Sequence, residues 1–210
     1  MTSKATIGSA AKERDGLNPK DFVFIAVFGI LLFLVFMVFM VFSIIFSANA
    51  NLCWFTHTVG ALFAGTVFMY LAYRVPKRGA IAIMGIIVGA VGLLMGMFWS
   101  GPVGIVVGGI VADLIAGDPQ KRTKTKLICA FAAFTFCFWL GQISLILMMG
   151  EAYAEMCVQA GMTLEYGQTL VNSILSPMGV VTGAATIAGG LVGGFIGTKV
   201  FSKHFAKLGM

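Results

Sequence analysis

The chain has 210 residues, of which 59% are hydrophobic and only 10% are charged. Soluble domains carry about 25% charged residues, so this composition excludes an ordinary water-soluble domain. The net charge of +6 reflects fourteen Lys and Arg residues against eight Asp and Glu residues. Several apolar runs reach the roughly 20 residues that a bilayer-spanning helix needs. The composition therefore predicts an all-α membrane protein that crosses the bilayer several times.

A polar segment, residues 1–20, precedes the first apolar run and is expected to be a cytoplasmic tail. The run covers 22–46 and exceeds the roughly 7–15 apolar residues of a signal peptide. We therefore expect a first helix over 21–47 that is not cleaved off. Its side chains are bulky on every side, so it faces lipid or the apolar surface of another protein.

Hydropathy and helix breakers divide the rest of the chain. The six predicted transmembrane helices are 21–47, 55–73, 80–98, 102–117, 127–150 and 178–201. They form one transmembrane domain, 21–201, in which the mixed polar segment 151–177 is an outer loop or lid. Residues 202–210 form a second cytoplasmic tail. Glycines run through the fourth helix, so we expect it to be short or irregular. Such interruptions at membrane depth occur where protein or a cavity shields the backbone.

The basic residues give the orientation. With the N-terminus inside, six spans place all fourteen Lys and Arg residues on the cytoplasmic side. Cytoplasmic loops of membrane proteins carry an excess of Lys and Arg. We therefore expect a multi-pass protein of the plasma membrane with both termini in the cytoplasm. The positive net charge reflects this topology and requires no nucleic-acid partner.

Small residues recur at helical spacing in three of the predicted helices. The rows are Gly85, Gly89, Gly92 and Gly96; Gly104, Gly108, Ala112 and Ala116; and Ala185, Gly189, Gly193 and Gly197. Such rows let helix backbones approach closely in lipid. Two compatible interpretations are open: packing within a tight six-helix bundle, or a docking face for a partner membrane subunit.

Catalytic and nucleotide-binding motifs are missing from the chain. It carries no HExxH sequence, P-loop or dinucleotide-binding fingerprint, and no Ser/His/Asp set. We therefore predict a protein that is not an enzyme and has no ATPase of its own. Asp113 is an ionisable residue within the fourth span, which makes it a functional candidate. Alternatively, it lies near the cytoplasmic interface and is capped or paired with a loop Lys or Arg.

Polar and aromatic side chains gather on the predicted outer face. The candidate ligand-binding residues are Asn49, Asn51, Trp54, His57, Trp99, Trp139, Gln142, Glu151, Tyr153, Glu155 and Tyr166. Ser100, Glu165 and Asn172 lie on the same face. The alternative for each aromatic residue is the interfacial belt of membrane proteins. Because this face has three carboxylates and no Lys or Arg, it favours a neutral or cationic ligand that is flat and partly apolar.

Several roles are open for His57. Cys53 precedes it by four residues, so the two are half of a metal site, which Met156 and Cys157 could complete as soft ligands. Alternatively, Cys53 and Cys157 form a disulfide. A third possibility is a hydrogen-bonding His at the rim of a pocket, and a fourth is a purely structural His. No cysteine pair has CxxC spacing, so no zinc or redox motif is indicated.

Three stretches carry a resemblance to a known family: "NPKDFVFIAVFGILLFLV", "IVADLIAGDPQKRTKTKL" and "IGTKVFSKHFAKLGM". They resemble the substrate-binding S components of energy-coupling-factor (ECF) transporters and, more narrowly, the Trep-Strep family of integral membrane proteins. The resemblance implies high-affinity binding of a vitamin or similar micronutrient from outside. It also implies docking on a transmembrane T component that two cytoplasmic ATPase subunits drive. The first outer loop and the segment 151–172 then cover the pocket.

The docking face departs from the pattern that this resemblance implies. Many S components carry two alanines four residues apart on the first helix, whereas this chain has Ala26 and Gly29. The predicted docking residues are therefore Ala26 and Gly29 together with Gly85, Gly89 and Gly92 of the third helix.

The resemblance leaves the ligand open. A haem or other tetrapyrrole substrate would make His57 an axial metal ligand. A thiamine-like cation would instead suit Glu151, Glu155 and the aromatic rings. No intrinsic cofactor is expected. The alternative function is a self-contained secondary transporter or channel for a small molecule, which usually has inverted repeats; the sequence shows no convincing repeat.

Overall fold

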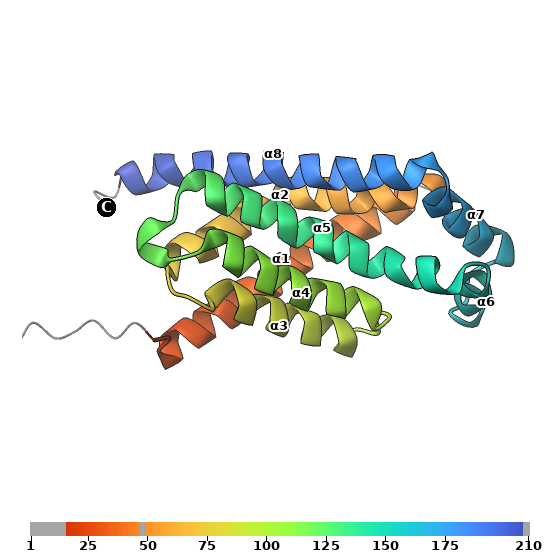
Figure 1. Cartoon of the computed structure of the whole chain (residues 1–210), viewed down its shortest axis with the longest axis horizontal. Coiled ribbons are helices and arrows are strands. Elements are labelled where there is room, and N and C mark those ends of the chain that lie inside the picture. The colour runs from red at the N-terminus through yellow and green to blue at the C-terminus, as the bar shows by residue number, and fades with distance from the viewer. Residues whose placement is uncertain (1–15, 47–48, 208–210) are drawn as a thin grey trace, which may run out of the picture.

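The computed structural model describes residues 16–46 and 49–207, although not the side chains of residues 40, 42–46, 51 and 202–207. The described part is helical and contains no strand. Its elements are α1 (Pro19–Phe46), η1 (Ala50–Phe55), α2 (Thr56–Arg74), α3 (Ala80–Leu94), α4 (Ser100–Ala116), η2 (Pro119–Lys121), α5 (Lys124–Met149), α6 (Ala152–Gln159), α7 (Leu164–Leu175) and α8 (Pro177–Lys207). The long helices run side by side, and α6 and α7 cover one end (Figure 1).

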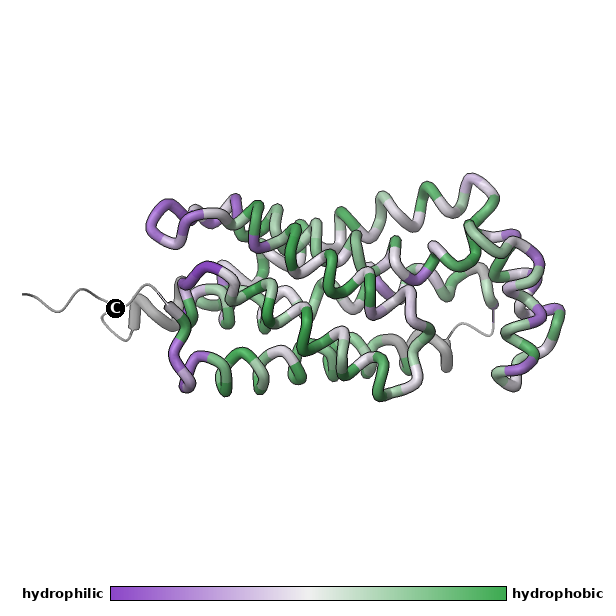
Figure 2. Tube along the Cα trace, turned by 60° about the horizontal axis from the view of Figure 1, so that its bottom comes forward, coloured by the Kyte–Doolittle hydropathy of each residue, from purple (hydrophilic) through white to green (hydrophobic). Residues whose placement is uncertain are grey.

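Four of the described helices are long and apolar enough to cross a membrane: Pro19–Phe39, Leu52–Arg74, Lys124–Met149 and Pro177–Phe201. Two shorter apolar helices, α3 and α4, accompany them. Figure 2 shows hydrophobic residues along the bundle and hydrophilic residues toward its two ends. The chain is therefore built as a multi-pass membrane protein.

The helix bounds agree with the sequence-based prediction to within a few residues at most ends. Two larger differences have local causes. The third helix ends at Leu94 rather than 98, because Gly96 adopts a positive φ of 82° and turns the chain. The predicted outer segment 151–177 holds two helices, α6 and α7, instead of an open loop. Gly161, with a positive φ of 89°, makes the turn between them.

The small-residue rows pack the bundle internally. A Cβ atom on Gly85 would lie 2.8 Å from the Cα of Gly109, which brings α3 against α4. A Cβ on Gly104 would lie 2.6 Å from the Cα of Gly141, which brings α4 against α5. The pair Gly65 and Gly193 joins α2 to α8 in the same way. The structure therefore supports the interpretation of the rows as packing surfaces.

This packing corrects most of the predicted docking face. Gly85, Gly89 and Gly92 are buried inside the chain and cannot contact a partner subunit. Gly29 is also buried, because it faces Met84 and Val88 of α3. Of the five predicted docking residues, Ala26 alone is partly exposed. The spacing of the glycines showed that close contacts form, but it did not show which surface they contact.

The start of α1, the end of α8 and the α2–α3 and α4–α5 loops lie at the end opposite to α6 and α7 (Figure 1). These two loops carry Lys77, Arg78, Lys121 and Arg122. At this end Asn18 and Asp21 cap the start of α1, since each side chain accepts a hydrogen bond from the backbone N–H of the other, at 2.8 and 2.9 Å. Asp21 also forms an ion pair of 2.8 Å with Lys77 in the loop between α2 and α3. We refer to this end as the basic end.

Asp113 connects three elements at the basic end. Its carboxylate accepts hydrogen bonds from the backbone N–H groups of Gly79 and Ile81, at 2.9 and 3.3 Å, and so caps the start of α3. Arg122, after η2, lies 3.7 Å away and has a side chain only 6% exposed. Burial lowers the pKa of the Arg122 guanidinium, and the Asp113 carboxylate acts against this shift. The structure therefore confirms that Asp113 takes part in a helix cap and pairs with a loop Arg.

Candidate functional site

The lid consists of α6 and α7, which follow α5 and precede α8. Gly150, with a positive φ of 55°, ends α5 and turns the chain into α6. The Thr163 hydroxyl caps α7 by accepting a hydrogen bond from the N–H of Tyr166 at 3.2 Å. Gly167 lets α7 approach α6 closely, because a Cβ there would lie 2.9 Å from the Cα of Ala154. Local turn and cap signals thus fold the lid as a helical hairpin.

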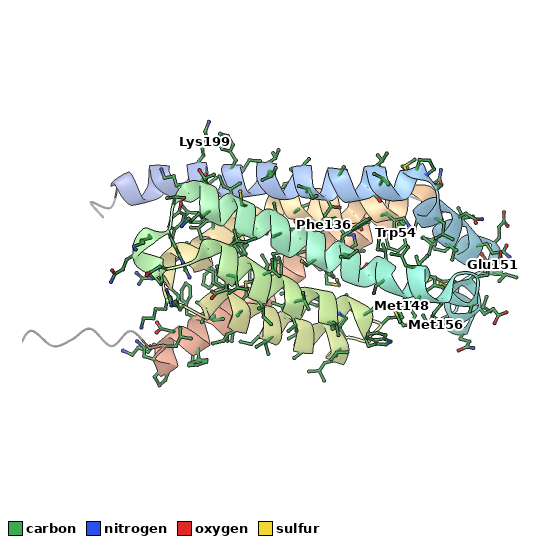
Figure 3. The ribbon with its side chains drawn as sticks, viewed as in Figure 1. Trp54, Phe136, Met148, Glu151, Met156 and Lys199 are labelled. Atoms are coloured by element: carbon green, nitrogen blue, oxygen red, sulfur yellow. The ribbon has the colours of Figure 1, made fainter. Side chains whose placement is uncertain are left out.

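The first loop passes under this lid. Trp54, in η1, is 4% exposed, and its indole Nε1–H donates a hydrogen bond of 3.0 Å to the Ser173 hydroxyl of α7. That hydroxyl in turn donates to the carbonyl oxygen of Leu170 at 2.8 Å. Figure 3 shows Trp54 within the bundle, with Glu151 and Met156 farther out on the lid. A bond between segments 119 residues apart in sequence therefore fastens the first loop to the lid.

A cavity of about 700 Å³ lies between the lid, η1 and the start of α4. Its walls come from η1, the α3–α4 turn, α4, α5 and both lid helices. The lining residues are Cys53, Trp54, Met95, Gly96, Met97, Phe98, Ser100, Gly101, Gln142, Tyr153, Met162, Thr163, Tyr166 and Leu170. None of these side chains carries a formal charge at neutral pH in its ordinary protonation state. The cavity is therefore apolar with a few neutral hydrogen-bonding groups.

Two of those polar groups lie where α4 meets α5. Ser100, the first residue of α4, is 2% exposed, and its hydroxyl has no hydrogen-bond partner within the described part of the chain. A Cβ on the next residue, Gly101, would lie 3.4 Å from Cγ of Gln142. The close approach of Gly104 to Gly141 brings these two helix segments together. A buried hydroxyl and a primary amide thus share one corner of the cavity.

The lid contributes phenols and thiols that stay protonated. Burial raises the pKa of Tyr166 to about 12, and the neighbouring Cys53 adds to the shift. Burial is also the main cause of the raised pKa values of Tyr153 and Cys157. Cys53 and Cys157 are both free thiols. Of these groups, Cys53, Tyr153 and Tyr166 line the cavity, where they offer hydrogen bonds to a ligand and no negative charge at neutral pH.

Four of the predicted ligand-binding residues meet at this cavity: Trp54, Gln142, Tyr153 and Tyr166. Other predicted residues lie elsewhere. Glu151 and Glu155 are exposed on α6, and Trp99 is 54% exposed beside the cavity without lining it. Asn49 is exposed, and the side chain of Asn51 lies outside the described residues.

His57 lies away from the predicted rim. It is 4% exposed, its ring packs edge-on against Phe138 with centroids 4.9 Å apart, and its Nδ1 lies 3.4 Å from the Thr56 hydroxyl. It borders a void of only about 10 Å³ rather than the cavity. His57 lies in the first turn of α2, directly after the outer loop, but its side chain faces the interior of the bundle and not the rim of the cavity.

The described side chains do not form a group of metal ligands with His57. Among the described residues, no three His, Cys, Asp or Glu side chains form a group that could hold a metal ion.

Trp139 also lies off the cavity, since its ring packs against Phe136 at 5.6 Å and contacts the backbone at Gly183. The indole nitrogen of Trp139 is buried without a partner within the described chain.

The sequence-based selection missed mainly sulfur and small residues. Met95, Met97 and Phe98 line the cavity from the α3–α4 turn, and Met162 does so from the lid. The available signal was the short stretch "LLMGMFWSGP", which the topology places on the same side as the lid. Selection for polar groups, tryptophans and tyrosines passed over these residues, although ligand pockets are lined mostly by apolar side chains.

A family model for a hypothetical bacterial integral membrane protein, Trep_Strep, matches residues 19–207. The chain belongs to the Trep_Strep family. The match covers every helix from α1 to α8, including the lid and the residues that line the cavity. Comparisons with curated proteins and with solved structures found no match. The family membership establishes an integral membrane protein.

Proposed function

We propose that the chain is the substrate-binding subunit, or S component, of an ECF importer for a vitamin or similar micronutrient. The observation that carries the proposal is the cavity of about 700 Å³ under the lid. The lid helices α6 and α7, which border the cavity, lie at the end of the bundle opposite to the basic end (Figure 1). The cavity volume falls within the roughly 300–1,000 Å³ of small-molecule sites. A lidded, apolar cavity with few polar groups suits one small ligand that is bound tightly.

The proposal includes six transmembrane spans, with both termini and the basic end in the cytoplasm. The excess of Lys and Arg at that end supports this orientation. Helices α3 and α4 have 15 and 17 residues, or about 22 and 26 Å at about 1.5 Å per residue. They are shorter than a bilayer core of about 30 Å. Both pack against neighbouring helices: α3 against α1 and α4, and α4 against α3 and α5.

Transport energy would come from other subunits, a T component and two ATPases. The motif survey supports this part of the proposal, because the chain has no P-loop. The T component would dock on the exposed face of α1, where Val23, Val27 and Ile30 surround the partly exposed Ala26. This face replaces the buried glycines that the sequence suggested.

Affinity purification from native membranes tests the proposal. Tagged chain in mild detergent is expected to bring down a T component and two ATPases, identified by mass spectrometry. Ala26→Trp should weaken that association, because an indole would disrupt a close helix contact. Ala90→Trp, on the exposed side of α3, is the matched control and should not. Purification without ATPases, together with substrate transport in liposomes that contain this chain alone, would establish a self-contained transporter instead.

A further inference from the structure

We infer that the ligand of the cavity is an uncharged, flat molecule of two or three fused rings that presents a ring carbonyl to Ser100 and Gln142. The inference rests on the proposed function and names its substrate class. Three features of the cavity carry it: the charge of the lining, the hydrogen-bonding corner and the shape and chemistry of the remaining wall.

The lining contains no group to pair with a charged ligand. Its residues include no Lys, Arg, His, Asp or Glu. The acidic residues of the lid, Glu151, Glu155 and Glu165, are exposed on its outer surface. An ion moved into such a cavity would lose its hydration without gaining a counter-ion, which is costly. The charge balance therefore favours a neutral ligand over an anion or a cation.

Cation–π contacts do not remove this cost. A cation binds over an exposed ring face, but the rings of Trp54 and Tyr153 are buried among protein atoms. Phe98 lies edge-on to Tyr153, with centroids 6.2 Å apart and planes at 64°. Phe98 and Tyr153 therefore do not form parallel walls around a cationic group.

The corner of Ser100 and Gln142 offers hydrogen-bond donors to an acceptor on the ligand. Buried hydroxyls are nearly always hydrogen-bonded, yet that of Ser100 has no partner in the described chain. Ser100 begins α4, a helix of 17 residues, whose N-terminus carries a partial positive charge. The Gln142 amide supplies further N–H donors. A ring carbonyl would satisfy the hydroxyl, the amide and the field of the helix together.

The rest of the wall suits a flat ring system. Met95, Met97 and Met162 line the cavity with Phe98 and Leu170. Thioether sulfur is polarizable and makes favourable contacts with aromatic rings. The volume of about 700 Å³ leaves room for more than a single ring. An apolar fused-ring body with one polar edge matches this distribution.

A charge series on one ring system tests the inference. The probes are three acridones that carry hydroxyethyl, carboxymethyl or trimethylammonioethyl on the ring nitrogen, so that the ring system and its carbonyl stay the same while the charge of the substituent changes. Binding to the purified full chain in nanodiscs is followed by quenching of tryptophan fluorescence. The neutral probe is expected to bind at least about tenfold more tightly than either charged probe, because burial of an unpaired ion is costly.

Variants test the corner separately. Ser100→Ala and Gln142→Leu should each weaken binding of the neutral probe by about five- to tenfold, the effect of one lost hydrogen bond. Ser144→Ala is the control, because its hydroxyl donates to the Gly141 carbonyl at 2.7 Å and does not line the cavity. Melting temperatures of all variants establish that they are folded.

The outcomes separate the two proposals. Equal or tighter binding of a charged probe overturns the inference on charge, as does failure of all three probes to bind. Unchanged affinity in both corner variants overturns the assignment of the corner. In each of these cases the S-component proposal still stands if a T component and ATPases co-purify with the chain. Their absence overturns that proposal, whatever the probes show.

Discussion

Two aspartates near the end of α4 show how burial decides how much an ion pair contributes to the stability of the fold. Asp113 faces Arg122, whose side chain is 6% exposed, whereas Asp118 faces Arg78, whose side chain is 73% exposed. Exposed pairs contribute little because water competes for both charges. Removal of one partner from a buried pair leaves the other charge without compensation. The two residues therefore make a matched pair for mutation.

Asp113→Asn should lower the free energy of unfolding by about 3 kcal/mol, because Arg122 would remain buried without its counter-ion. Asp118→Asn should lower it by less than about 1 kcal/mol. Thermal denaturation in a single detergent measures both. Equal losses in the two variants would contradict the structural role of Asp113.

Trp54→Phe should loosen the lid while it keeps most of the buried ring. The variant loses the indole N–H that donates to Ser173, a bond worth about 1 kcal/mol. Amide hydrogen exchange in α7 should therefore become about fivefold faster. Trp99→Phe is the control, since Trp99 is exposed and lies off the cavity. Faster amide exchange in α7 of the Trp99→Phe variant, or an unchanged rate in the Trp54→Phe variant, would contradict the role of this hydrogen bond in holding the lid.

For single residues, the sequence predicts the polar or aromatic character of a site better than it predicts which way each side chain points. Trp54, Gln142, Tyr153 and Tyr166 were selected for polar or aromatic character on the outer side, and they meet at one cavity. His57 shares both properties but points into the core beside Phe138. A difference of one residue in where a helix begins rotates a side chain by about 100°. Hydropathy does not locate a helix start that closely.

At the scale of the element, glycine sets the distance between helices. Gly104 and Gly141 bring α4 and α5 into backbone contact, which places Ser100 and Gln142 at the same corner. Helix spacing and site geometry are therefore coupled. The glycine rows were visible in the sequence, but the choice among α2, α5, α8 and a partner subunit depends on the three-dimensional arrangement.

Gly104→Ala tests this coupling. The new Cβ would lie 2.6 Å from the Cys137 carbonyl oxygen, so the helices must separate, at a cost of about 1–3 kcal/mol. We expect a lower melting temperature and weaker probe binding. Val103→Ile adds one carbon to the exposed side of the same helix and should change neither. An unperturbed Gly104→Ala variant would contradict the close packing of α4 and α5.

At the scale of the whole molecule, charge divides the bundle into two different ends. The basic end contains Lys77, Arg78 and Arg122, with their ion pairs. The lid end exposes Glu151 and Glu155. The positive-inside rule predicted this separation from the sequence. The side on which each loop lies depends only on whether an odd or an even number of spans precedes it. The helical hairpin of the lid was not predictable from hydropathy, since α6 and α7 are short and amphipathic.

Impermeant amine labelling of intact cells tests the orientation. A membrane-impermeant N-hydroxysuccinimide ester should not label the native chain, because the proposed topology places every lysine inside. Gln159→Lys, on the exposed surface of α6, should become labelled. Gln120→Lys, in the α4–α5 connection, should react only after permeabilisation. Labelling of native chain in sealed cells would contradict the proposed topology.

The ion pairs of the basic end also have a mechanical consequence. Lys77 ties α1 to the α2–α3 loop, while Asp113 and Arg122 tie α4 to the start of α3 and to the loop that enters α5. These cross-links stiffen one end, whereas at the other end the described links between the first loop and the lid are uncharged, such as the indole hydrogen bond of Trp54. An internal gate at the stiff end would have to break these contacts, including the pair between Asp113 and the buried Arg122. If the chain is the S component proposed above, these cross-links favour reorientation of the whole body over an internal gate at the basic end.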